Sequence, residues 1–105
     1  MRRAATALLT LALIAGCGTH APTLRETCDA LAPVVHDFGK IAPTPSRFDA
    51  YAPRVRAIID QGDDEAQTAL EPYAAAFESG SVWQLAGVSI GTQSLCKAAG
   101  STGWN

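Results

Sequence analysis

Apolar side chains recur every three or four residues in two successive stretches, the spacing of one face of an α-helix. Thr23 and Glu26 precede the first stripe at the spacing of a capping box. Ser46 and Asp49 precede the second, and we interpret them as another such box. Each stripe ends at a glycine. The stripe positions are Leu24, Cys28, Leu31, Val35 and Phe38, then Phe48, Tyr51, Val55, Ile58 and Ile59.

The second half of the chain continues the helical pattern. Asp63 is placed to cap a third helix that ends at Gly80, and Ser81 to start a fourth that ends at Gly100. No stretch alternates apolar and polar residues as a half-buried strand does. The sequence therefore predicts an all-α domain over residues 23–100, a small bundle of three to four short helices. The inward positions of the third and fourth helices are Ala66, Leu70, Tyr73, Phe77, Leu85, Val88, Thr92, Leu95 and Cys96.

Three prolines, at positions 33, 53 and 72, fall inside these patterns. A proline in a helix interior lacks an N–H donor and clashes with the preceding turn. We therefore expect each one to kink or restart its helix, which would make the helices shorter than the stripes.

Residues 79–96 carry no charge, which raises the alternative of a membrane-spanning helix. More than half of these residues are Gly, Ser, Thr or Gln, so their transfer into lipid would be unfavourable. We predict instead a central helix buried on most sides. Gly87 and Gly91 lie four residues apart, as in motifs that let helices approach closely. We favour packing against a neighbouring helix over a dimerisation face.

The N-terminal segment has the layout of an export signal. Two arginines follow Met1, then come 13 uncharged residues from Ala4 to Gly16, too few to span a bilayer. The sequence from Leu13 to Cys17, Leu-Ile-Ala-Gly-Cys, resembles the bacterial lipobox. That resemblance implies a signal peptide over 1–16, a diacylglyceryl group on the Cys17 thiol, and a lipidated cysteine and linker over 17–22. The alternative is an ordinary secretory signal, which would leave Cys17 as an unpaired thiol.

Cys28 and Cys96 remain once Cys17 is assigned to the lipid. In an exported protein we expect them to form a disulfide that joins the first and last helices. The spacing is not Cys-x-x-Cys, which argues against a redox-active dithiol, and no pair of histidines supports a metal site.

Charge excludes one class of partner. From residue 17 onward the chain has six basic and ten acidic residues, a formal net charge of −4. Because nucleic-acid-binding domains carry a basic excess, we expect no nucleic acid. Without a polybasic cluster, attachment to the membrane would depend on the lipid alone.

No catalytic constellation is evident, so we predict no enzyme activity, no catalytic residue, no metal and no cofactor beyond the covalent lipid. His36 and Asp37 are adjacent, and neighbouring side chains on a helix point about 100° apart. A hydrolase built on His36 stays an alternative that would need His36 exposed beside a nucleophile in a cleft. The acidic residues at positions 60 and 63–65 lack the spacing of a calcium loop, so we interpret them as a helix cap and a solvated turn.

The two tryptophans are the most informative remaining side chains. We expect Trp83 in the core. Trp104, in the tail over residues 101–105, either packs back onto the bundle, which we favour, or stands exposed to contact a partner.

The lipobox, the Ala- and Arg-rich composition, and the frame from Thr-Cys-Asp-Ala (27–30) to Leu-Cys-Lys-Ala-Ala-Gly (95–100) resemble small lipoproteins of actinobacteria and their phages. The resemblance implies a lipid anchor on the extracytoplasmic face of the cell membrane. Because the expected disulfide-linked bundle lacks catalytic groups, our leading hypothesis is a non-enzymatic module that binds a protein of the envelope. A second hypothesis is a phage- or prophage-encoded factor that excludes a second phage, with a tail or DNA-injection component as its partner.

Overall fold

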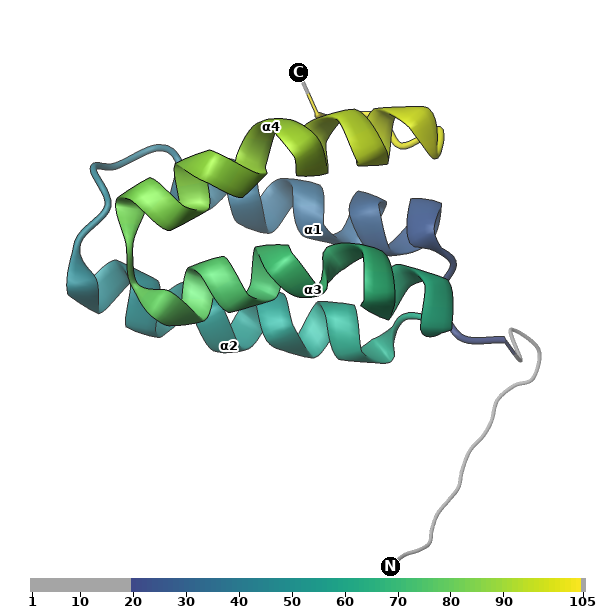
Figure 1. Ribbon diagram of the computed structural model, residues 1–105, viewed down its shortest axis with the longest axis horizontal. Coiled ribbons are helices and arrows are strands. Elements are labelled where there is room, and N and C mark those ends of the chain that lie inside the picture. The colour runs from purple at the N-terminus through teal and green to yellow at the C-terminus, as the bar shows by residue number, and fades with distance from the viewer. Residues whose placement is uncertain (1–19, 105) are drawn as a thin grey trace, which may run out of the picture.

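A computed structural model describes residues 20–104 (Figure 1). The predicted signal peptide over 1–16 and the predicted lipidation of Cys17 lie outside the described residues. Between residues 20 and 104 the chain forms four helices and no strand, so the all-α prediction is confirmed. The helices are α1 (Leu24–Phe38), α2 (Pro45–Gln61), α3 (Asp64–Ser79) and α4 (Val82–Ala98).

Side-chain caps define the helix starts. In α1 the Thr23 hydroxyl accepts from the Glu26 amide, and the Glu26 carboxylate accepts from the Thr23 amide, which confirms the capping box. The predicted box at Ser46 is wrong. Thr44 is the N-cap of α2, with Pro45 in the first turn, where its missing N–H costs nothing because that position has no helical acceptor.

The predicted caps of the last two helices are confirmed. Asp63 accepts from the Ala66 amide at the start of α3, and Ser81 accepts from the Gln84 amide at the start of α4. Between them, Gly80 ends α3 with a φ of 68°, a left-handed conformation that glycine adopts without steric cost. This one residue turns the chain from α3 into α4.

The prolines do not shorten the helices, contrary to our expectation. Pro33, Pro53 and Pro72 lie inside α1, α2 and α3, which continue through them to lengths of 15, 17 and 16 residues. All three are exposed. On an outer face, water can satisfy the carbonyl group that loses its helical partner, so packing outweighs the local cost.

The core lies between α1, α2 and α3, and it is built around edge-to-face aromatic rings. The Phe38 ring contacts those of Phe48, Tyr51 and Phe77 at centroid separations of 5.0–5.3 Å. Tyr73 extends this cluster toward the C-terminus through contacts with Phe77 and Trp104. In Figure 1, α4 lies along one edge of the bundle, over α1 and α3, and it makes no contact with α2.

A charged cluster on the surface joins α2 to α3. The Arg56 guanidinium donates to both carboxylate oxygens of Glu71, at 2.6 and 3.1 Å, and to both of Glu78, at 2.9 and 2.7 Å. Asp60 lies 3.7 Å from the same guanidinium. These contacts hold the pKa values of Glu71 and Glu78 below the usual range, because the hydrogen bonds from Arg56 stabilise the ionised carboxylates.

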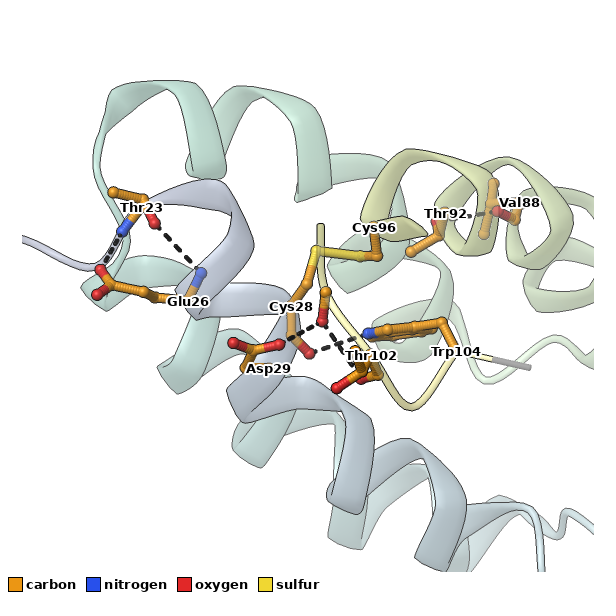
Figure 2. Close-up of a disulfide and its surroundings, with 10 residues drawn as sticks. Thr23, Glu26, Cys28, Asp29, Val88, Thr92, Cys96, Thr102 and Trp104 are labelled. Atoms are coloured by element: carbon orange, nitrogen blue, oxygen red, sulfur yellow. Dashed lines mark hydrogen bonds between the residues drawn. A yellow bond between two sulfur atoms is a disulfide. The ribbon is translucent and has the colours of Figure 1, made fainter. Parts of the chain in front are cut away.

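The C-terminal end of α4 is fastened to α1 (Figure 2). A disulfide joins Cys28 of α1 to Cys96 of α4, and both residues are fully buried. The tail then turns back across α1, where the Ser101 hydroxyl donates to Asp29 and the Trp104 indole N–H donates to the Cys28 carbonyl at 3.1 Å. Residues 101–104 therefore belong to the folded domain.

Candidate functional site

The outer face of α4 is the largest departure from the expected fold. We define this face by residues 82, 83, 86, 87, 90, 91 and 94, all of which are exposed. Three of them are large and apolar: Trp83 is 87 % exposed, Ile90 75 % and Val82 47 %. The remaining four are small, and none is charged. Single exposed apolar side chains are ordinary on protein surfaces, whereas a contiguous group indicates an interaction surface.

Two predictions about this segment are wrong. We expected α4 to be central and buried on most sides, but only Thr92 and Cys96 are buried. We expected Trp83 in the core, and it is the most exposed of the large apolar residues. The reason is that, among the other helices of residues 20–104, α4 contacts α1 and α3 and not α2, so one of its sides is left uncovered.

Gly87 and Gly91 do not pack against another of the described helices, contrary to the packing that we favoured. A Cβ atom added at either glycine would meet no atom of the described structure within 4 Å, apart from its chain neighbours and the backbone of α4 itself. The described part of the chain also contains no helix that has both the length and the apolar character needed to cross a membrane. The outer face of α4 is therefore not covered by any other part of the described fold.

Trp104 packs back onto the bundle, as favoured from sequence. Only 7 % of its surface is exposed, its ring contacts that of Tyr73, and its indole N–H is hydrogen-bonded. The alternative of an exposed partner contact does not fit this position, because the side chain is committed to the core. Of the two tryptophans, Trp83 is the one that a partner could reach.

A cleft of about 350 Å³ lies beside α4, between α1, α3 and the C-terminal tail. Its walls combine apolar and polar groups: Val35, His36, Gly39, Lys40, Tyr73, Ser89, Gln93, Gly103 and Trp104. Burial raises the pKa of the Tyr73 hydroxyl to about 12, so this group is neutral at physiological pH.

His36 lines this cleft, exposed, together with Ser89, so the geometric requirement of the hydrolase alternative is met in part. Both groups are engaged elsewhere. The His36 Nε2 atom lies 2.8 Å from the Gly103 carbonyl, to which it must act as donor, and the Ser89 hydroxyl donates to the Leu85 carbonyl. Asp37 accepts from the Tyr51 hydroxyl, which lowers the pKa of Asp37. The three side chains do not form a hydrogen-bonded relay.

The acidic residues at 60–65 have structural partners. Asp63 caps α3 and Asp60 lies beside Arg56. Within residues 20–104, no group of three or more His, Cys, Asp and Glu side chains has the geometry to hold a metal ion.

Sequence reasoning located the cysteine pair and the fold of the tail, and it missed the outer face of α4. A signal was present: residues 86, 87, 91 and 94, on this face, are Ala, Gly, Gly and Ser. A buried helix more often places large apolar residues against its neighbours.

Comparisons with protein-family models, with curated protein sequences and with solved structures find no match to this chain.

Proposed function

We propose that the protein is a lipid-anchored module on the extracytoplasmic face of the cell membrane, where it binds a protein of the envelope without catalysing a reaction. The observation that carries the binding role is the uncharged outer face of α4, with Trp83 and Ile90 exposed on it. Interaction sites are enriched in exposed aromatic residues and depleted in charge at their centre.

The cysteine usage supports an extracytoplasmic location. Cys28 and Cys96 form a buried disulfide, and structural disulfides persist mainly in oxidising compartments. Cys17, which the lipobox assigns to lipid, would otherwise be an odd thiol in the same compartment.

The start of the folded domain supports a short tether. The Asp63 amide donates to the Pro22 carbonyl at 2.8 Å, and the His20 ring lies 3.3 Å from the Glu26 carboxylate. Two residues, Gly18 and Thr19, lie between Cys17 and His20, and a chain spans at most about 3.3–3.6 Å per residue. A lipid on Cys17 would thus keep this end of the bundle within roughly 10 Å of the bilayer surface.

Metabolic labelling with a palmitate analogue tests the anchor. The full chain should incorporate the label and sediment with membranes, whereas Cys17→Ser should do neither. Intact-mass analysis of the purified product should show a modified Cys17 as the first residue. An unlabelled wild-type chain with a free thiol at Cys17 would refute the proposal.

The resemblance to short phage lipoproteins leads to a second candidate, exclusion of a superinfecting phage. Cells that express the chain would then adsorb phage normally and block DNA entry. Trp83→Ala should restore plating, while the control Ile41→Ala, which alters an apolar residue 61 % exposed in the α1–α2 loop, should not. Unaltered plating across a broad phage panel would refute this candidate.

A further inference from the structure

The outer face of α4 differs in charge from the rest of the described surface. The ten acidic residues lie on α1, α2 and α3 or in the turn between α2 and α3, and residues 79–96 have no charge at all. Two copies of a chain with net negative charge repel each other over most orientations. Contact through the outer face of α4 would bring two copies together without placing like charges opposite one another.

We infer that the envelope protein bound by this face is a second copy of the same chain, with the two α4 helices antiparallel and a two-fold axis at Gly87; the inference rests on the binding role proposed above for this face. A two-fold contact requires a surface that complements itself. Trp83, Gly87 and Gly91 are four residues apart and lie along one side of α4. With the axis at Gly87, the large Trp83 ring of each copy lies opposite Gly91 of the other.

The glycines give this arrangement its fit. Neither Gly87 nor Gly91 has an atom within 4 Å of where a Cβ would stand, so the helix backbone is open to an approaching surface. Small residues at this spacing let two helices approach closely enough for backbone contact. A flat indole over a glycine fills the hollow that the missing side chain leaves.

The size of the face predicts a weak dimer. A helix of 17 residues is about 25 Å long, and one aromatic side chain buries about 150–250 Å². Two such faces fall below the roughly 1,200 Å² total of stable interfaces, so we expect a transient association. Confinement of both copies at a membrane would strengthen it by raising their effective concentration. The contact itself does not rest on the lipid anchor.

Cysteine cross-linking of the full chain in membranes tests the register. In Gly87→Cys the new thiols of two copies meet at the axis, so mild oxidation should give a disulfide-linked dimer on a non-reducing gel. The matched control is Ser94→Cys, on the same exposed face seven residues further along. In the antiparallel pair two such thiols are about 21 Å apart, far beyond disulfide reach, and should not cross-link. The buried Cys28–Cys96 disulfide should not take part in cross-linking between copies. The chain without an added cysteine, treated in the same way, tests this.

Two further substitutions, made in the Gly87→Cys background, separate the contact from folding. Gly91→Leu fills the hollow opposite Trp83 and should abolish the cross-link. Helical circular dichroism should be retained and the melting temperature should not fall, because a Cβ at this position has open space around it and leucine is a better helix former than glycine. Trp83→Ala removes the central anchor and should weaken association about 10- to 30-fold. Ile41→Ala alters an exposed apolar residue that is not part of the outer face of α4, and it should leave the cross-link unchanged.

Three results would overturn the inference. Equal cross-linking of Gly87→Cys and Ser94→Cys would mean a parallel pair or random collision. An unchanged cross-link in Gly91→Leu would mean that the helices do not meet at this register. No cross-link, together with a blue shift of Trp83 emission on phosphatidylglycerol vesicles, would assign the face to the bilayer. A Cys17→Ser chain tested at high concentration in solution keeps this result independent of the lipid.

Discussion

The two helices α3 and α4 follow one another, have 16 and 17 residues, and make opposite use of their surfaces. α3 buries six residues, and four carboxylates lie at its exposed positions. α4 buries two residues and exposes a face without charge. The charge on a helix and its burial are therefore separate properties. A helix with an uncharged outer face can lie at the edge of a bundle.

The difference predicts that α4 depends on covalent attachment more than α3 does. Replacing both cysteines, Cys28→Ala with Cys96→Ala, should cost about 4 kcal/mol, the chain-entropy value for a closed loop of this length. Urea unfolding at equilibrium measures this loss. Amide hydrogen exchange should show protection falling first in α4, since it has few buried side chains to hold it in place.

Uniform loss of protection across α3 and α4 would contradict this difference between the helices. Ser94→Ala serves as the control, because it changes an exposed residue of α4 and leaves the disulfide intact. It should leave the protection of α4 unchanged.

The two tryptophans differ in the same way as α3 and α4, since Trp104 is buried in the core and Trp83 is exposed on the outer face of α4. Trp104→Ala should destabilise the fold by about 3 kcal/mol, the lower end for removing a buried Trp, since it leaves a cavity beside Tyr73 and removes the hydrogen bond to Cys28. Trp83→Ala should change stability by less than about 0.5 kcal/mol. Thermal unfolding of both variants checks the pair.

Fluorescence gives a second measure on the same two variants. The chain with only Trp83 should emit at the long wavelengths of a hydrated indole, and the chain with only Trp104 at shorter wavelengths. Similar emission from both variants would contradict the assigned environments.

The first three helices could be predicted from the sequence because several local signals agree. In α1 the capping box, the stripe through Cys28 and Leu31, and the terminal Gly39 all indicate the same helix, and packing confirms it. The start of α2 was displaced by two residues because Thr44 and Ser46 are both good caps. Pro45 decides between them, since it suits the first helical turn.

The place of α4 could not be predicted, because periodicity shows which residues share a face but not how many neighbours the helix has. Thr92 and Cys96 were correctly placed inward, yet Leu85 and Val88 are only partly buried. The cleft was missed for a related reason. It brings together His36, Ser89 and the tail at Gly103, which are far apart in the sequence.

Two glycine substitutions, one at a buried position and one on the outer face of α4, should have smaller effects on stability. Gly62, at the α2–α3 junction, is buried, and a Cβ there would lie 2.8 Å from both the Ala66 Cβ and the Thr27 hydroxyl. Gly62→Ala should therefore destabilise the fold by about 1–3 kcal/mol through overpacking. Gly87→Ala should stabilise the monomer by about 0.5–1 kcal/mol, because alanine is the better helix former and the site is open.

Urea titration of both glycine variants at low protein concentration measures these effects of opposite sign on the monomer. A destabilised Gly87→Ala monomer would mean that this glycine has a contact within the chain. It would remove the reason for assigning the glycine to a partner.

The smallest expected effect on stability comes from the charged surface between α2 and α3, where Arg56 pairs with Glu71 and Glu78. Hydrogen bonds from Arg56 lower the pKa values of Glu71 and Glu78, so these pairs stabilise the fold above the usual Glu value of about 4.5 and lose their contribution as the pH falls through the lowered values. Arg56→Met should lower the melting temperature slightly at pH 7, since exposed ion pairs contribute little. The deficit should shrink as the pH falls through the lowered pKa values of Glu71 and Glu78, because the wild-type chain then loses the pairs as well. Arg25→Met removes an exposed charge on α1 that forms no ion pair within residues 20–104, and it should show no such pH-dependent difference. A deficit for Arg56→Met that stays constant as the pH falls from 7 until both carboxylates are protonated would mean that packing of the arginine stem, rather than its charge, joins α2 to α3.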